Sequence, residues 1–196
     1  MRCAHSWALF GISVATLLLG ACAHSEFERQ HQRSVSENPA GVELEIRTRG
    51  GRQQFAPLEA VQFEEIYTSK YSEAWHIEVL DSLNDASSLD VLHVTDGSTI
   101  WNQRRELSGI ICCDSRHVWL SQDPVRIPYK LFANRTRANP EGWANPEWHT
   151  LHLPNKPGKY QVYVTTERVF GRGDSTTTYY GRGSAVSSNI LKLEVK

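Results

Sequence analysis

The stretch Leu153–Val164 reads LPNKPGKYQVYV, and it decides the fold. After its prolines and glycine, large apolar side chains recur at every second position, at Tyr160, Val162 and Val164. Successive side chains of a strand point to opposite faces of its sheet, so this alternation predicts a strand with one buried face. The proline–glycine cluster before it is typical of a turn.

The same alternation recurs along most of the chain from Val42 onward. The expected strands are VELEIRT, AVQFEEIYT, AWHIEVL, DVLHVTDG, VRIPYKLF, WHTLHL and NILKLEVK. Pro128 lies inside the fifth of these, which indicates an edge strand or a bulge because proline has no amide hydrogen to donate. We find no long amphipathic helix. Many short strands separated by turn residues predict an all-β sandwich.

Three of these segments resemble immunoglobulin-like domains. The entry into the strand at Tyr160 resembles the tyrosine corner of that fold, in which the tyrosine hydroxyl bonds to nearby backbone. SAVSSNILKLEVK resembles the last strand of bacterial immunoglobulin-like modules, and FAPLEAVQFEEIYT resembles their early strands. The resemblance covers residues 42–80 and 147–196. It implies an immunoglobulin-like antiparallel β-sandwich over 42–196, and it does not indicate an activity.

Residues 81–146 depart from this resemblance. We expect them to form an enlarged, irregular insertion in the middle of the sandwich, since an immunoglobulin-like domain needs only about 100 residues. The segment ends in ANRTRANPEGWANPEW, which is rich in Asn and Pro and predicts a long loop.

The N-terminus reads MRCAHSWALFGISVATLLLGACAHS. A basic residue, an apolar run and small residues form a secretory signal, with an apolar run too short for a membrane span. LLGAC resembles the lipobox of bacterial lipoproteins. That resemblance implies that residues 1–21 are removed and that Cys22 is acylated, for example with palmitate. Ala23 in place of Asp implies the outer membrane. The alternative is an ordinary signal peptide with a cysteine there by chance.

Residues 22–41 are polar after the cysteine, with only Phe27 and Val35 as larger apolar groups. Such a composition buries too little surface to offset its ordering entropy. We therefore expect this segment to be the lipidated cysteine followed by a flexible tether.

Cys112 and Cys113 are adjacent, and several interpretations of them remain open. Neighbours in a strand point to opposite faces, so a disulfide between them needs a strained turn. The alternatives are two structural thiols or an intermolecular bond. A metal site is disfavoured because Cys-x-x-Cys spacing is absent and His117 is the nearest histidine. A periplasmic thiol or redox enzyme centred on these residues is the rival function.

Two further features are candidates for binding. GRGDS at Gly171–Ser175 resembles the Arg-Gly-Asp attachment motif of fibronectin-like adhesive proteins, in which Asp174 would complete a receptor's metal site and Arg172 would meet an acidic groove. Its residues are also those of an ordinary tight turn. Trp143 lies in the Asn/Pro-rich loop, where it is a candidate platform for a glycan or part of the packing under the loop.

Charge and motifs exclude several classes of function. The 196 residues carry 21 basic and 22 acidic side chains, with no basic stripe for nucleic acid. The sequence lacks metal, phosphate-loop and nucleophile-elbow motifs, so we expect no cofactor, no metal and no catalysis. The prediction is a lipid-anchored module on the periplasmic or surface face of the cell envelope. It binds or scaffolds a partner protein or glycan through residues 134–148 and 171–183.

Overall fold

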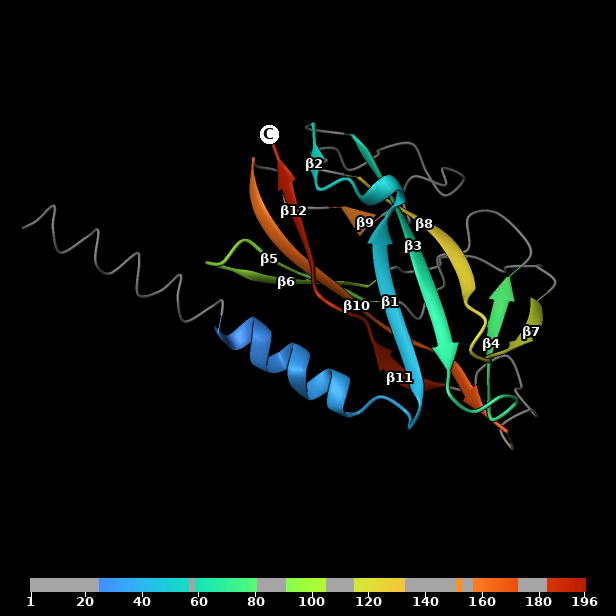
Figure 1. The fold of residues 1–196 in the computed structure, drawn as a ribbon. Helices are drawn as coiled ribbons and strands as arrows, with labels where there is room; N and C mark the ends of the chain where they lie inside the picture. Colours follow the sequence, from blue (N-terminus) through green and yellow to red (C-terminus); the bar gives the residue numbers. More distant parts are fainter. Residues whose placement is uncertain are drawn as a thin grey trace, which may run out of the picture.

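The computed structural model describes residues 25–56, 59–80, 91–104, 115–132, 151–152, 157–172 and 183–196. Two β-sheets pack face to face, and a helix lies against the outer face of one of them (Figure 1). The predicted all-β sandwich is confirmed, and its immunoglobulin-like character stays a prediction. Within the described ranges, none of the helical structure is long and apolar enough to span a membrane.

The smaller sheet has four strands in the order β1-β3-β8-β9. Their bounds are β1 Val42–Thr48, β3 Ala60–Ser69, β8 Val125–Phe132 and β9 Leu151–His152. In β1 every second side chain is buried, as its alternating sequence predicts. β8 pairs with β3 through Pro128, whereas β9 pairs with β8 only at Leu131 and Phe132. β8 therefore lies between β3 and β9 and is not the edge strand of the described sheet, although no described strand pairs with Pro128 on the side away from β3.

The larger sheet has eight strands, arranged around the long strand β10. They are β2 Gln54–Phe55, β4 Trp75–Leu80, β5 Val91–Thr95, β6 Ile100–Arg104, β7 Ser115–Trp119, β10 Gly158–Gly171, β11 Ser184–Ser187 and β12 Leu191–Val195. β12 and β11 follow one another along one edge of β10, and β5 and β4 follow one another along the other. β2 pairs with β12 in parallel.

The predicted irregular middle is wrong at β6 and β7; the other two strands within residues 81–146, β5 and β8, match the expected strands DVLHVTDG and VRIPYKLF. β4 and β5 run in the same direction along β10, and β7 and β6 pair with them on the far side. The four strands thus form one long hairpin. β5, β6 and β7 extend the larger sheet, and β8 belongs to the smaller one.

The core between the sheets consists of two apolar clusters. The first contains Ile46, Phe55, Val61, Phe63, Leu92, Val94, Tyr160, Val162, Val164, Leu193 and Val195. The second contains Val42, Leu44, Tyr67, Ile77, Leu120, Ile127, Val169 and Val186. Each cluster draws side chains from both sheets, so each fastens one sheet to the other by burial of apolar surface. Tyr160 of the predicted corner belongs to the first cluster and is buried.

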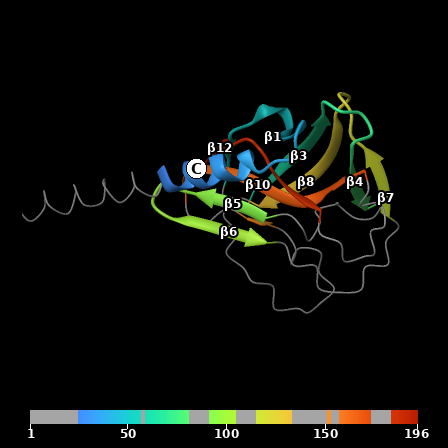
Figure 2. The same ribbon diagram turned by 90° about the horizontal axis from the view of Figure 1, so that it is seen from below.

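The predicted flexible tether is wrong for residues 25–41. Residues 25–36 form a helix that lies along β5 and β10 (Figures 1 and 2). Phe27 is completely buried, and its ring lies 5.2 Å from that of Tyr163. Phe27, His31 and Ser34 are spaced four and three residues apart, so they share one face of the helix. Composition alone conceals this face, because only one of its members is strongly apolar.

Candidate functional site

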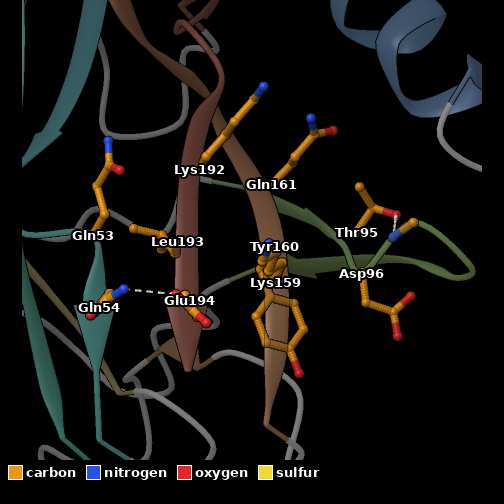
Figure 3. Close-up of a pocket in the computed structure, with 11 residues that line it drawn as sticks. Gln53, Gln54, Thr95, Asp96, Lys159, Tyr160, Gln161, Lys192, Leu193 and Glu194 are labelled. Carbon is orange, nitrogen blue, oxygen red and sulfur yellow. Dashed lines mark hydrogen bonds between the residues drawn. The ribbon is translucent and has the colours of Figure 1, made fainter. Parts of the chain in front are cut away.

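A polar groove lies on the outer face of the larger sheet, beside the docked helix (Figure 3). Its volume is about 360 Å³. The lining residues come from the approach to β2, from β12, from the start of β10 and from the β5–β6 turn. They are Gln53, Gln54, Thr95, Asp96, Gly97, Lys159, Tyr160, Gln161, Lys192, Leu193 and Glu194. Cavities of this size hold small ligands in other proteins.

The strand register arranges the polar side chains in two rows. Glu194 lies opposite Lys159 on β10 and opposite Gln54 on β2. In the next row, Gln161 lies opposite Lys192 on β12 and opposite Thr95 on β5. Side chains two residues apart on a strand share a face, so both rows project away from the core. Figure 3 shows them rising from the strands.

The two carboxylates of the groove are held by local contacts. Asp96 Oδ1 accepts hydrogen bonds from the backbone of Ser98 and Thr99 at 2.9 Å each, which closes the β5–β6 turn. Gln54 Nε2 donates to Glu194 Oε2 at 2.9 Å. Burial raises the pKa of the Tyr160 hydroxyl, and the negative charge of Asp96 adds to this rise. The phenol therefore stays protonated at neutral pH.

Other polar groups in the groove have no partner among the described residues. The Gln161 Oε1 atom is buried and accepts no hydrogen bond from them. Lys159 and Lys192 are exposed at the rim, and neither forms an ion pair with a described residue. The groove thus offers two ammonium groups and an amide to a ligand. Such an arrangement can bind a small polar molecule through hydrogen bonds, and it contains no activated nucleophile beside a base.

Most residues predicted as sites lie outside the described residues. These are Cys22, Cys112, Cys113, Trp143 and Asp174. Arg172 is described: it is exposed just past β10, and its backbone amide donates to the Ala74 carbonyl at 2.9 Å. The predicted roles of these residues in binding or thiol chemistry therefore stay predictions.

His117, the histidine nearest to the cysteine pair in sequence, lies on β7 and is exposed. Its ring stacks on that of His76 at 4.7 Å, and Trp119 meets His76 edge-on at 5.0 Å. No cluster of three His, Cys, Asp or Glu side chains in the described ranges could hold a metal ion.

The sequence analysis missed the groove and the exposed aromatic residues. Tyr71 is 57% exposed and Trp119 is 44% exposed, at turns and strand ends far from the helix start. The groove residues come from four strands, so no short motif contains them. The available signal was the run of polar side chains alternating with the buried positions of β10 and β12.

No protein-family model matches the chain, and no curated protein matches it. Among solved structures, the chain is similar to a CARDB domain of the PF1109 protein from Pyrococcus furiosus, solved in complex with di-metal ions. The TM-score is 0.33 at 9% identity, covering 79% of this chain and 87% of that one.

Two further structures are similar over only part of their length. Spo0M, a sporulation control protein from Bacillus subtilis, gives a TM-score of 0.36 at 10% identity, covering 81% of this chain and 50% of that one. A beta-glucosidase from Listeria innocua gives 0.35 at 12% identity, covering 79% and 16%. At these TM-scores and identities, none of the three carries an argument about function.

Proposed function

We propose that the chain is a lipid-anchored module of the cell envelope that binds or scaffolds a partner without catalysis. Cys22 carries the acyl chains, and the β-sandwich is the part that makes contacts. The observation that carries this proposal is the position of the helix, whose first described residue, Ser25, lies three residues after Cys22 and which is docked on the sandwich.

The docked helix supports a position of the domain close to the membrane surface. Asn38, just beyond the helix, pairs with the backbone of Ser187 on β11: its amide donates to the Ser187 carbonyl at 3.0 Å and accepts from the Ser187 amide at 2.7 Å. With Phe27 buried at the other end, the segment is held to the sheet at both ends. Cys22 is only three residues before Ser25, the first described residue of the helix, so the acyl chains would hold the domain against the lipid surface.

This mount would place a defined end of the domain next to the membrane. Figures 1 and 2 both show the β5–β6 turn beside the start of the helix. The turn holds Asp96 and Gly97, which line the polar groove. The groove would then lie near the lipid headgroups, while Tyr71, Trp119 and Arg172 would face away from the membrane. Exposed Tyr, Trp and Arg side chains are enriched at protein interfaces, so we propose the distal end as the partner surface.

Metabolic labelling with a radioactive palmitate tests the anchor. The wild-type chain should incorporate label and appear in the membrane fraction. Cys22→Ser should lose both properties, because the acylated side chain is gone. Cys3→Ser is the matched control and should label like the wild type, since residue 3 lies in the segment that is cut off. Equal labelling of the wild type and Cys22→Ser would overturn the anchor.

A further inference from the structure

The helix meets the sheet mainly at one aromatic ring. Tyr163 on β10 is 1% exposed and is covered by Phe27 and His31 of the helix. Both contact its ring edge-on, with centroids 5.2 Å and 4.9 Å away. Ser34, one turn further along, hydrogen-bonds the Tyr163 hydroxyl. Three successive turns of the helix thus rest on this one side chain.

A second imidazole lies beneath the same contact. His93 on β5 stacks on the Tyr163 ring, with centroids 4.3 Å apart and planes only 9° from parallel. Its Nδ1 lies 2.8 Å from Asn102 Oδ1, and a carbonyl oxygen only accepts, so Nδ1 is assigned as the donor. The Nε2 atom then carries a lone pair and no hydrogen. It is buried and has no hydrogen-bond partner among the described residues.

The surroundings of His93 contain no described carboxylate that would favour its cation. The groups facing it are the Tyr163 ring from β10, the Asn102 amide from β6 and the His31 imidazole from the helix. Two carboxylates of this segment pair with its own arginines: Glu26 with Arg29 at 2.6 Å, and Glu37, just past the helix, with Arg33 at 3.5 Å.

His31 is itself fixed to the sheet. Its Nε2 lies 2.7 Å from the Ser188 carbonyl oxygen, so this nitrogen donates. A donor at Nε2 is present in both the neutral and the protonated ring. This bond therefore holds the His31 ring beside His93.

We propose that the helix of residues 25–36 is a latch that opens when His93 is protonated. A proton on the buried Nε2 creates a donor with no acceptor among the described residues, and a cation next to the His31 ring. Releasing the helix exposes this nitrogen to water, which solvates both. The latch thus couples a titration on β5 to the position of a helix that is distant in sequence.

The direction of the effect follows from the burial of His93. Burial lowers the pKa of His93, the nearby His31 lowers it further, and the hydrogen bond with Asn102 opposes both. The docked form therefore prefers the neutral ring, whereas the released form has the ordinary pKa near 6.5. Docking is at full strength above this value and weakens as the pH falls below it. Each unit of difference between the two pKa values is worth about tenfold in the docking equilibrium.

Release would lengthen the connection to the membrane. A flexible chain of the length of residues 23–41 spans roughly 22–26 Å on average. In mild acid the domain would change from being held close to the membrane to being connected to it by a flexible chain. This consequence rests on the proposed anchor at Cys22, whereas the docking equilibrium does not: Cys22→Ser should show the same pH dependence. Loss of the anchor and loss of the latch are therefore separate results.

Hydrogen exchange of the full-length chain in detergent, from mildly alkaline to mildly acidic pH, tests the latch. After correction for the intrinsic pH dependence of exchange, helix amides should lose protection several-fold below the ordinary histidine pKa, while β10 amides keep theirs. His93→Gln should abolish this pH dependence. His117→Gln, which removes an exposed histidine on β7, should retain it. The proposal fails if the wild-type helix shows no such dependence, or if His93→Gln shows the same one.

A titration covers the case in which His93→Gln disturbs the docking itself. The His93 ring resonance of the wild type should titrate at lower pH than that of Phe27→Ala, in which the helix has lost its main contact. If docking of the helix and protonation of His93 exclude one another, thermodynamic linkage requires this difference in the pKa of His93. Identical pKa values for His93 in the two proteins would overturn the latch.

Discussion

Arg168 on β10 and Glu65 on β3 form an ion pair inside the sandwich. The Arg168 Nη2 atom lies 3.7 Å from Glu65 Oε2, and each side chain is only 1% exposed. The Tyr67 hydroxyl donates to the same carboxylate oxygen at 2.7 Å. On β3, Glu65 stands between Phe63 of the first apolar cluster and Tyr67 of the second. The pair thus joins the two sheets at the point where the two clusters meet.

Glu65→Gln should destabilise the fold by about 3–5 kcal/mol, because it removes the negative charge that pairs with the buried Arg168 cation. Urea unfolding measures the change. Glu64→Gln is the matched control on the neighbouring residue. Glu64 pairs with Arg47 at 2.9 Å on the surface, and such pairs contribute about 0–1 kcal/mol. Equal unfolding midpoints for the two variants would contradict this role.

Joint replacement of the pair separates charge from packing. Glu65→Leu combined with Arg168→Met should recover much of the stability lost in Glu65→Gln, since apolar substitutes for buried ion pairs are often neutral or stabilising. A double variant less stable than Glu65→Gln would mean that the hydrogen bond from Tyr67, and not the charge, dominates.

Phe27→Ala should release the helix while leaving the sandwich folded. Deletion of a fully buried Phe side chain costs about 3–5 kcal/mol, which is more than a single short helix can spare. Circular dichroism should show loss of helical signal, and trypsin should cleave at the exposed Arg29 and Arg33. Val35→Ala removes an apolar side chain that is 38% exposed on the same helix and should change neither readout.

The Asn189 side chain pairs with the backbone of β1 in the way that a neighbouring strand would. Its side chain accepts from the Ile46 amide at 2.7 Å and donates to the Ile46 carbonyl at 3.2 Å. Asn189→Ala should cost about 1–3 kcal/mol and speed hydrogen exchange at the Ile46 amide. Asn38→Ala provides the crossed control: it should speed exchange at Ser187 and leave Ile46 protected. Unchanged exchange at Ile46 in Asn189→Ala would refute the assignment.

Two glycines next to β10 should respond differently to alanine. A Cβ atom on Gly183 would meet the Glu167 carbonyl oxygen at 2.1 Å and that of Val169 at 2.6 Å, so the backbone must shift. On Gly158 the nearest atoms would be those of the Tyr160 ring at 3.8 Å, an ordinary contact. Gly183→Ala should therefore lower the thermal midpoint clearly, by several degrees, while Gly158→Ala should change it little. Equal midpoints would contradict this close approach.

The strands could be predicted because one buried face imposes a period of two on residues such as Val42, Leu44 and Ile46. The helix could not, because its docking face combines Phe27 with polar His31 and Ser34, and the stabilising contact comes from Tyr163, distant in sequence. The groove was likewise invisible, since β-register, not local sequence, brings Lys159 beside Glu194. Glu65 gave no signal either: its charge suggested exposure, and its burial depends on a partner distant in sequence, Arg168.

Photo-cross-linking to lipid tests the close membrane mount most directly. A benzophenone side chain is placed at Ser98 in the β5–β6 turn or at Asp123 in the β7–β8 turn, both exposed, in the lipidated full-length chain in membranes at neutral pH. Figures 1 and 2 place the first beside the helix start and the second at the opposite end. The docked helix predicts lipid adducts from position 98 and few from position 123. Equal yields from both positions, or none from either, would contradict the account.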